Sequence, residues 1–277
     1  MLNHLVDVDV ALRSRVLKHI VEQVRNTPLE RQPFPHFVLG DFLPQDFYND
    51  LLAKLPAPSL YEPFVDLKYH RDTGTTNRFR FQFTNWWLSR LSDRQRVVWA
   101  TLRSVIGSQE LKQSVFEKLA PGLSLRYGVS ETDASRMPGF ALPELFRETE
   151  GYSIKPHPDT RKKVVTMQLA LAEHEGQRDL GTEFYRSSFD PRHWLRAPRG
   201  FDVVKRAPFI PNTVYAFSVL NLLTLKSWHG RTAIRGDFGV RNSLLNIWYQ
   251  NPEHGNSDLI EDSNWFASQS SQPRAAA

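Results

Sequence analysis

Short apolar segments, separated by turn-prone stretches, recur through the second half of the chain and constrain its fold more than any other feature. They cover residues 123–127, 164–171, 182–185, 213–219 and 243–249. Short strands at such even spacing are typical of a β-sandwich or barrel. We therefore predict a mainly β core in residues 121–252.

The first part of the chain follows the helical period instead. Apolar residues recur three or four positions apart from residue 8 to 27, with Arg and Lys between them, and Pro28 ends the pattern. A short strand is expected over 34–40, and further helices over 41–55 and 86–119. Residues 1–120 are thus predicted to be a helical region that supports the β core, within one structural domain.

Composition excludes several kinds of site and partner. The chain has no cysteine, so any metal must be held by nitrogen and oxygen ligands. Its net charge of +5 is small for 277 residues, which favours a mixed-charge surface over nucleic-acid binding. No apolar run approaches the roughly 20 residues that span a bilayer. Because the N-terminus lacks the pattern of a secretory signal, we expect a cytoplasmic protein.

Two imidazoles and one carboxylate stand out as candidate metal ligands. His157 and Asp159 lie two apart, so on an extended segment both side chains point to the same side. His229 precedes Gly230, where a backbone can pass close to a metal. Two His and one carboxylate can occupy one face of an octahedral iron(II) and leave the opposite face open. A lone His-x-Asp is also compatible with an ordinary loop histidine.

A candidate carboxylate-binding group follows on the C-terminal side. Arg241 opens an apolar strand and shares one face of it with Ser243. A guanidinium is a planar, permanent cation suited to a bidentate carboxylate contact. Arg231 and Arg235 are alternatives for this role, because they lie between His229 and Arg241.

One strand face offers further candidates for the wall of the same pocket. Thr166, Gln168 and Ala170 alternate along residues 164–171. Gln168 is the best polar candidate among them, although a buried structural amide explains it equally well.

The ordered set His157-x-Asp159, His229 and Arg241-x-Ser243 resembles the catalytic double-stranded β-helix of the Fe(II)/2-oxoglutarate-dependent dioxygenases, in the branch that includes prolyl hydroxylases. The resemblance covers residues 121–252, just under half of the chain. It implies a jelly-roll core supported by α-helices. It also implies that His157, Asp159 and His229 hold Fe(II), while Arg241 and Ser243, with Gln168 and Thr166 nearby, bind 2-oxoglutarate.

The same resemblance implies an oxygenase activity. Such an enzyme hydroxylates an unactivated C–H bond while 2-oxoglutarate and O2 become succinate and CO2. The carboxylate of Asp159 argues against halogenation, because related halogenases carry a small residue there. A free small molecule is the expected substrate, and a peptide or protein side chain is the alternative. A catalytically silent jelly-roll module that holds zinc is the rival from another class.

Two stretches are expected to lie outside the regular core. Residues 186–208 are predicted to form a long polar loop, whose Arg residues either recognise an acidic substrate or are simply solvated. Residues 253–277 are rich in Ser, Gln and Asn, and are predicted to form a flexible tail. Neither the substrate nor the oligomeric state follows from the sequence.

Overall fold

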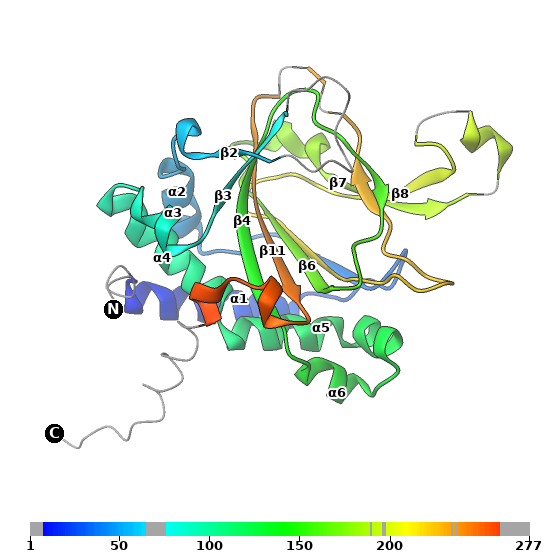
Figure 1. Ribbon diagram of the computed structural model, residues 1–277, viewed down its shortest axis with the longest axis horizontal. Coiled ribbons are helices and arrows are strands. Elements are labelled where there is room, and N and C mark those ends of the chain that lie inside the picture. The colour runs from blue at the N-terminus through cyan, green and yellow to red at the C-terminus, as the bar shows by residue number, and fades with distance from the viewer. Residues whose placement is uncertain are drawn as a thin grey trace.

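The computed structural model describes residues 8–64, 76–188, 190–195, 198–233, 235–236 and 238–260. Two antiparallel sheets dominate it (Figure 1). The larger has the strand order β1-β9-β6-β11-β4-β3-β2, and the smaller has the order β5-β10-β7-β8.

The major sheet consists of β1 (His36–Leu39), β2 (Glu62–Pro63), β3 (Arg78–Gln82), β4 (Phe140–Glu148), β6 (Lys163–Ala170), β9 (Val214–Ser218) and β11 (Arg241–Tyr249). The minor sheet consists of β5 (Ile154–His157), β7 (Thr182–Ser187), β8 (Phe201–Ala207) and β10 (His229–Arg231). From β4 onward the chain passes back and forth between the two sheets, which is the winding of a double-stranded β-helix. The fold predicted from the sequence is therefore confirmed.

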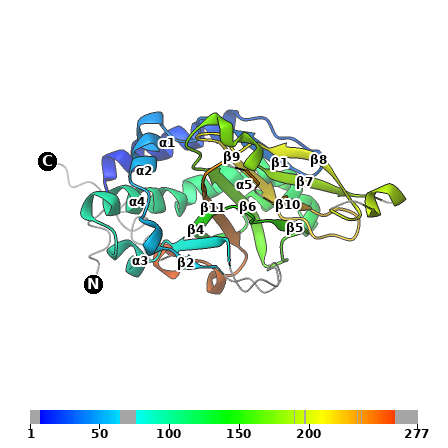
Figure 2. The same cartoon turned by 90° about the horizontal axis from the view of Figure 1, so that it is seen from above.

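Helices cover one face of the major sheet. They are α1 (Val10–Asn26), α2 (Gln45–Ala53), α3 (Asn85–Ser89), α4 (Asp93–Ile106), α5 (Gln109–Tyr127) and α6 (Glu131–Arg136). Short 3-10 turns lie at Pro58–Leu60, Glu175–Leu180, Pro191–Trp194 and Pro252–His254. Seen from above, α1, α2 and α4 gather at one end of the molecule and the minor sheet lies at the other (Figure 2). No helix in the described ranges combines the length and apolarity needed to cross a membrane.

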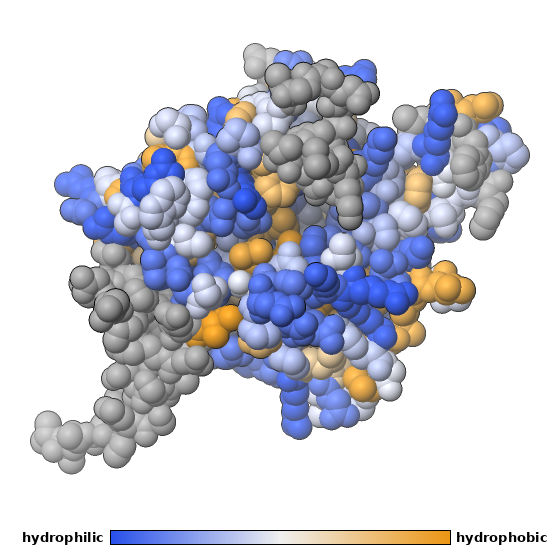
Figure 3. Space-filling view, in the orientation of Figure 1, coloured by the Kyte–Doolittle hydropathy of each residue, from blue (hydrophilic) through white to orange (hydrophobic). Residues whose placement is uncertain are grey.

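Alternation along the strands separates an apolar face from a polar one. On β11, Leu244 and Trp248 are buried in the core that the helices share with the major sheet. Arg241 and Ser243 point the opposite way: Arg241 lines the cavity between the two sheets, and the Ser243 hydroxyl accepts from Gln168 in the cavity wall. The outer surface is mostly hydrophilic on the face shown in Figure 3, with scattered apolar side chains.

Most of the predicted elements are confirmed, but the start of the β core is not. Residues 123–127 are not a strand, because α5 continues through Pro121 to Tyr127. Leu119 and Leu123, one helical turn apart, are both fully buried. The stability gained from this packing outweighs the loss of one helical hydrogen bond, for which proline has no backbone N–H. The first core strand is instead β4, which the apolar spacing did not predict.

Two further predictions need correction. The expected loop 186–208 contains the end of β7 and all of β8, which pair with each other. The expected tail begins as packed structure, because Leu259 is buried and the Asn256 side chain donates to the backbone oxygen of Phe83. Residues 261–277 lie outside the described part of the chain.

Gly122 is predicted to be essential for the contact between α5 and β9. A Cβ at this position would lie 2.8 Å from Cβ of Ser218 and 3.0 Å from Cβ of Pro35, neither of which can rotate away. Gly122→Ala should therefore lower the free energy of unfolding by about 1–3 kcal/mol despite the higher helix propensity of alanine. Urea denaturation measures this. Gly40→Ala, where the added Cβ meets nothing within 4 Å, should leave stability nearly unchanged.

Candidate metal centre

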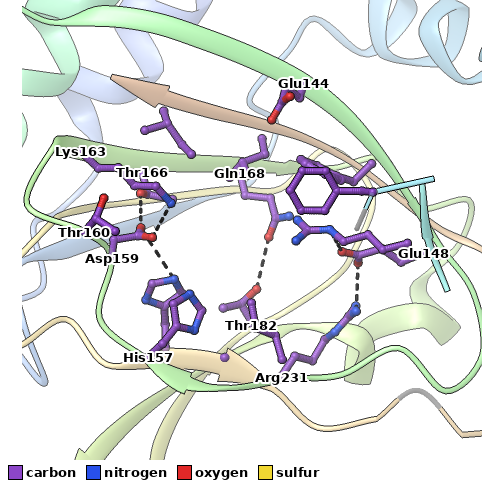
Figure 4. A pocket seen from close by; sticks show the side chains of 18 of the residues that line it. Glu144, Glu148, His157, Asp159, Thr160, Lys163, Thr166, Gln168, Thr182 and Arg231 are labelled. Carbon is purple, nitrogen blue, oxygen red and sulfur yellow. Dashed lines mark hydrogen bonds and ion pairs between the residues drawn. The ribbon is translucent and has the colours of Figure 1, made fainter. Parts of the chain in front are cut away.

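His157, Asp159 and His229 come together at the end of the minor sheet. His157 ends β5, Asp159 lies in the turn that follows, and His229 begins β10. The antiparallel register pairs His157 directly with His229. One metal-binding atom from each of the three residues lies within 4.8 Å of the others. These are the three residues that the sequence singled out, and Figure 4 shows His157 and Asp159 at the same end of the cavity.

The same kind of hydrogen bond orients both imidazoles. Nδ1 of His157 lies 2.9 Å from the backbone oxygen of Lys155, and Nδ1 of His229 lies 2.9 Å from that of Ser227. A carbonyl oxygen only accepts, so each Nδ1 carries the proton and donates it. The lone pair of each ring is therefore on Nε2, the state that a metal ligand needs.

Two neighbouring side chains hold the carboxylate of Asp159. Lys163 binds Oδ1 at 2.5 Å, and the hydroxyl of Thr166 donates to Oδ2 at 2.7 Å. Burial opposes the charged form, but the charge of Lys163 is the leading cause that outweighs it and, with the hydrogen bond from the same side chain, holds the pKa of Asp159 well below its usual range. Thr166, expected beside the co-substrate, contacts the candidate metal ligand instead.

Burial also keeps the two histidines neutral. Burial is the largest cause that lowers the pKa of His157 to about 3, and the neighbouring His229 is the second largest. Burial likewise lowers the pKa of His229. Two neutral imidazoles and one carboxylate are therefore presented near neutral pH without competition from protons. This nitrogen, nitrogen and oxygen donor set fits iron(II) in a 2-His-1-carboxylate centre.

The centre opens into a cavity of about 500 Å³ between the two sheets. Gln168, Thr182 and Tyr215 line its middle, where the Tyr215 hydroxyl donates to Oε1 of Gln168 at 2.6 Å. Nε2 of Gln168 donates to the Ser243 hydroxyl at 3.0 Å. Gln168 therefore lines the cavity, and its buried amide is also hydrogen-bonded to its neighbours. The structure agrees with both expected roles, that of a pocket-wall residue and that of a structural amide.

Arg241 lies in the same cavity and faces two ways. Its Nη2 donates to Oε1 of Gln168 at 3.2 Å, and its Nη1 donates to Glu148 at 2.6 Å and to Ser243 at 3.3 Å. Arg231 also reaches Glu148, at 3.0 Å, whereas Arg235 is exposed and lies outside the lining. Arg241 and Arg231 thus both remain candidates for carboxylate binding.

Glu148 is the functional-site residue that sequence reasoning missed most clearly. It is 2% exposed and contacts Arg78, Arg231 and Arg241. Burial would raise its pKa, but Arg231, Arg241 and Arg78 outweigh burial and lower the pKa to about 2. Burial in turn lowers the pKa of Arg231 to about 10. Residues 140–148 carry no regular alternation of apolar and polar residues, and Pro143 lies within them, so the sequence offered no clear signal for this strand or its inward carboxylate.

Comparison with solved structures places the fold in a wider context. A prolyl hydroxylase from Trichoplax adhaerens, solved with a hypoxia-inducible-factor peptide, matches with 11% identity, a TM-score of 0.51 and 94% coverage of each chain. The fold is that of the Fe(II)/2-oxoglutarate-dependent oxygenases. No family model matches the sequence, and no curated protein matches it.

Two bacterial structures are similar at lower scores. A prolyl-4-hydroxylase from Pseudomonas putida has 12% identity and a TM-score of 0.46, with coverage of 84% of this chain and 98% of the other. A 2OG-Fe(II) oxygenase family protein from Burkholderia pseudomallei has 15% identity and a TM-score of 0.44, with coverage of 87% and 93%.

Gly230 is predicted to control the spacing of the two imidazoles. A Cβ there would lie 2.7 Å from the backbone oxygen of Ile154 and 3.0 Å from that of Lys155, so β5 would have to move away from β10. Gly230→Ala should weaken metal binding by about ten- to a hundredfold, the range seen when groups that orient ligands are lost. Calorimetric titration with Co(II) measures this. Unchanged affinity in a folded variant would contradict the prediction, and Gly40→Ala is the control.

Glu148 is predicted to make stability depend on pH. Because its folded pKa of about 2 lies below the ordinary 4.5, its contribution is complete above about pH 4.5 and is lost as pH falls towards 2. Glu148→Gln should cost about 3 kcal/mol at pH 7 and flatten the pH dependence of unfolding in that window. Urea denaturation across the pH range tests both effects. The exposed Glu173→Gln should change neither, and an equal effect there would refute the assignment.

Proposed function

We propose that this chain is a non-haem Fe(II)/2-oxoglutarate-dependent oxygenase that hydroxylates an unactivated C–H bond of a small molecule. The observation that carries the proposal is the His157, Asp159 and His229 cluster, which opens into the same cavity as Arg241. Iron(II) bound there would supply the oxidative chemistry, in which 2-oxoglutarate, O2 and a C–H bond yield succinate, CO2 and a C–OH group.

The residues around the cluster prepare it for this reaction. Nδ1 of each imidazole is tied to a backbone carbonyl, so both Nε2 atoms are aimed before any ligand arrives. Lys163 and Thr166 bind both oxygens of Asp159 and fix its orientation. A donor set held in this way loses little entropy when it binds a metal.

Arg241 and Ser243 are proposed to bind the distal carboxylate of 2-oxoglutarate. Nη2 of Arg241 and the Ser243 hydroxyl both face Gln168 in the middle of the cavity. Thr182 and Tyr215 add two hydroxyl groups at the same place. When an anion binds there, Arg241 would exchange its hydrogen bond to the neutral Gln168 for a hydrogen bond to a negatively charged group, which is stronger.

A small molecule is the favoured substrate. The cavity of about 500 Å³ lies within the range of small-molecule sites, and no described residue between 188 and 206 lines it. Of the two expectations for the 186–208 stretch, substrate recognition or a solvated surface, the described residues therefore give no support to the first. A peptide remains the alternative, because the Trichoplax structure holds one.

Succinate formation tests the proposed activity directly. Protein loaded with iron(II) under anaerobic conditions and then exposed to O2 should convert 2-oxoglutarate to succinate. His157→Ala should abolish this conversion, because one metal ligand is lost. Arg241→Ala should raise the KM for 2-oxoglutarate at least about tenfold, the loss expected for a charged hydrogen bond, and high co-substrate should partly restore the rate.

His174→Ala is the matched control, because this histidine is exposed and lies outside the cavity lining. It should retain wild-type turnover. Binding of zinc without any affinity for 2-oxoglutarate would overturn the proposal and favour a silent jelly-roll module.

A further inference from the structure

One wall of the cavity carries a row of charges across three neighbouring strands. Arg78 on β3, Glu148 on β4 and Arg241 on β11 occupy the same register, so their side chains lie side by side on the inner face. Arg231 reaches the same carboxylate from the minor sheet, opposite this row. Figure 4 shows Glu148 and Arg231 at the end of the cavity away from His157 and Asp159.

This cluster is not electrically balanced. Three guanidinium groups contact the carboxylate of Glu148, whereas Glu144, the other buried carboxylate on this face of β4, is paired with Arg80. Buried charges are costly unless opposite charges pair with them. The distal carboxylate of 2-oxoglutarate at Arg241 would supply one further counter-charge, and Arg78 and Arg231 would still share the single carboxylate of Glu148.

Hydrogen-bond donors of two of these arginines are also unused. Nη1 and Nη2 of Arg231 and Nε of Arg78 are buried and have no hydrogen-bond partner among the residues that the structure describes. Both side chains come near Glu148, at 3.0 and 3.1 Å, but these ion pairs lack hydrogen-bond geometry. Arg231 is only 5% exposed, and unsatisfied donors on so buried a cation indicate a missing acceptor.

These donors lie on a different side of the cavity from the proposed 2-oxoglutarate contacts. Gln168 and Ser243 belong to β6 and β11, whereas Glu148 and Arg78 belong to β4 and β3, on the far side of β11. Arg241 stands between the two groups, with Nη2 towards Gln168 and Nη1 towards Glu148. Arg241 therefore separates two sets of polar groups in the same cavity, one around Gln168 and one around Glu148.

Aromatic rings surround the unused donors. The guanidinium of Arg78 lies 3.8 Å from the ring centre of Phe146 and 5.1 Å from that of Phe64. The guanidinium of Arg231 lies 4.7 Å from the ring centre of Tyr152. Such rings hold the flat faces of the cations and leave their edges for a ligand. All three rings line the cavity, so they also offer apolar surface to a substrate.

We propose that the substrate to be oxidised is a small carboxylic acid, whose carboxylate binds to Arg78 and Arg231 and whose apolar body lies against Phe64, Phe146 and Tyr152. This inference rests on the proposed oxygenase function, because it assigns the remaining half of that cavity. The planar fork of a guanidinium matches a carboxylate, and two such forks discriminate against an uncharged analogue.

Matched acids and alcohols test the inference. The protein is loaded with nickel(II), so that it does not turn over, and is saturated with 2-oxoglutarate. Calorimetric titration then compares the affinity for phenylacetate with that for 2-phenylethanol, and the affinity for 3-phenylpropanoate with that for 3-phenylpropan-1-ol. The acids should bind, and each alcohol should bind at least about tenfold more weakly, because charged hydrogen bonds are lost. Arg78→Gln and Arg231→Met should remove this preference while 2-oxoglutarate still binds.

Arg147→Gln is the matched control. Arg147 precedes Glu148 on β4, points to the opposite face of the strand and is absent from the cavity lining, so this variant should keep the preference for acids. The inference fails if no acid binds, if alcohols bind as well as acids, or if 2-oxoglutarate displaces the acids. Failure of the proposed function is distinct, because 2-oxoglutarate itself would then not bind the nickel-loaded wild type.

A stability measurement separates this ligand role from a purely structural one. Because Arg231 also helps to keep Glu148 charged, Arg231→Met should lower the melting temperature of the protein without ligand, so the effect of ligand decides between the two roles. Phenylacetate should raise the melting temperature of the nickel-loaded wild type with saturating 2-oxoglutarate, and should not raise that of Arg231→Met. An equal rise in both proteins would overturn the inference.

Discussion

Packing of the helices on one face of the major sheet is the constraint on which the rest of the molecule depends. Side chains along a strand alternate between two faces. Once Leu244 and Trp248 of β11 are buried against the helices, Arg241 and Ser243 must face the space between the sheets. The helical region therefore contributes no candidate metal ligand among the described residues, yet it decides which side chains enter the cavity.

Two buried carboxylates organise that cavity from opposite ends. Asp159 is held by Lys163 and Thr166 beside the imidazoles, and Glu148 is held by arginines. Both are kept charged because nearby cations outweigh the cost of burial. Positioned charges of this kind need no reorganisation when ligands arrive, which is how a protein prepares a site for chemistry.

Two parts of the candidate site were predictable because their signals are local, whereas His229 joins them from 70 positions beyond Asp159. His157 and Asp159 lie two residues apart, and Arg241 and Ser243 repeat that spacing on an apolar strand. Glu148 and Arg78 were not predicted, because the role of each side chain depends on partners that lie on other strands. The strand that carries Glu148 was missed when residues 123–127, whose short apolar pattern suits a strand, were placed at the start of the core.

By itself, the sequence determined the types of candidate metal ligand, the absence of thiolate chemistry, the β character of the second half and most of the early elements. Local spacing and composition are sufficient for these properties. Only the tertiary structure decided where α5 ends, that β8 lies within a polar stretch, and that three arginines share one carboxylate. Those outcomes depend on burial and cross-strand register, which join residues far apart in the chain and leave no periodic trace in either partner alone.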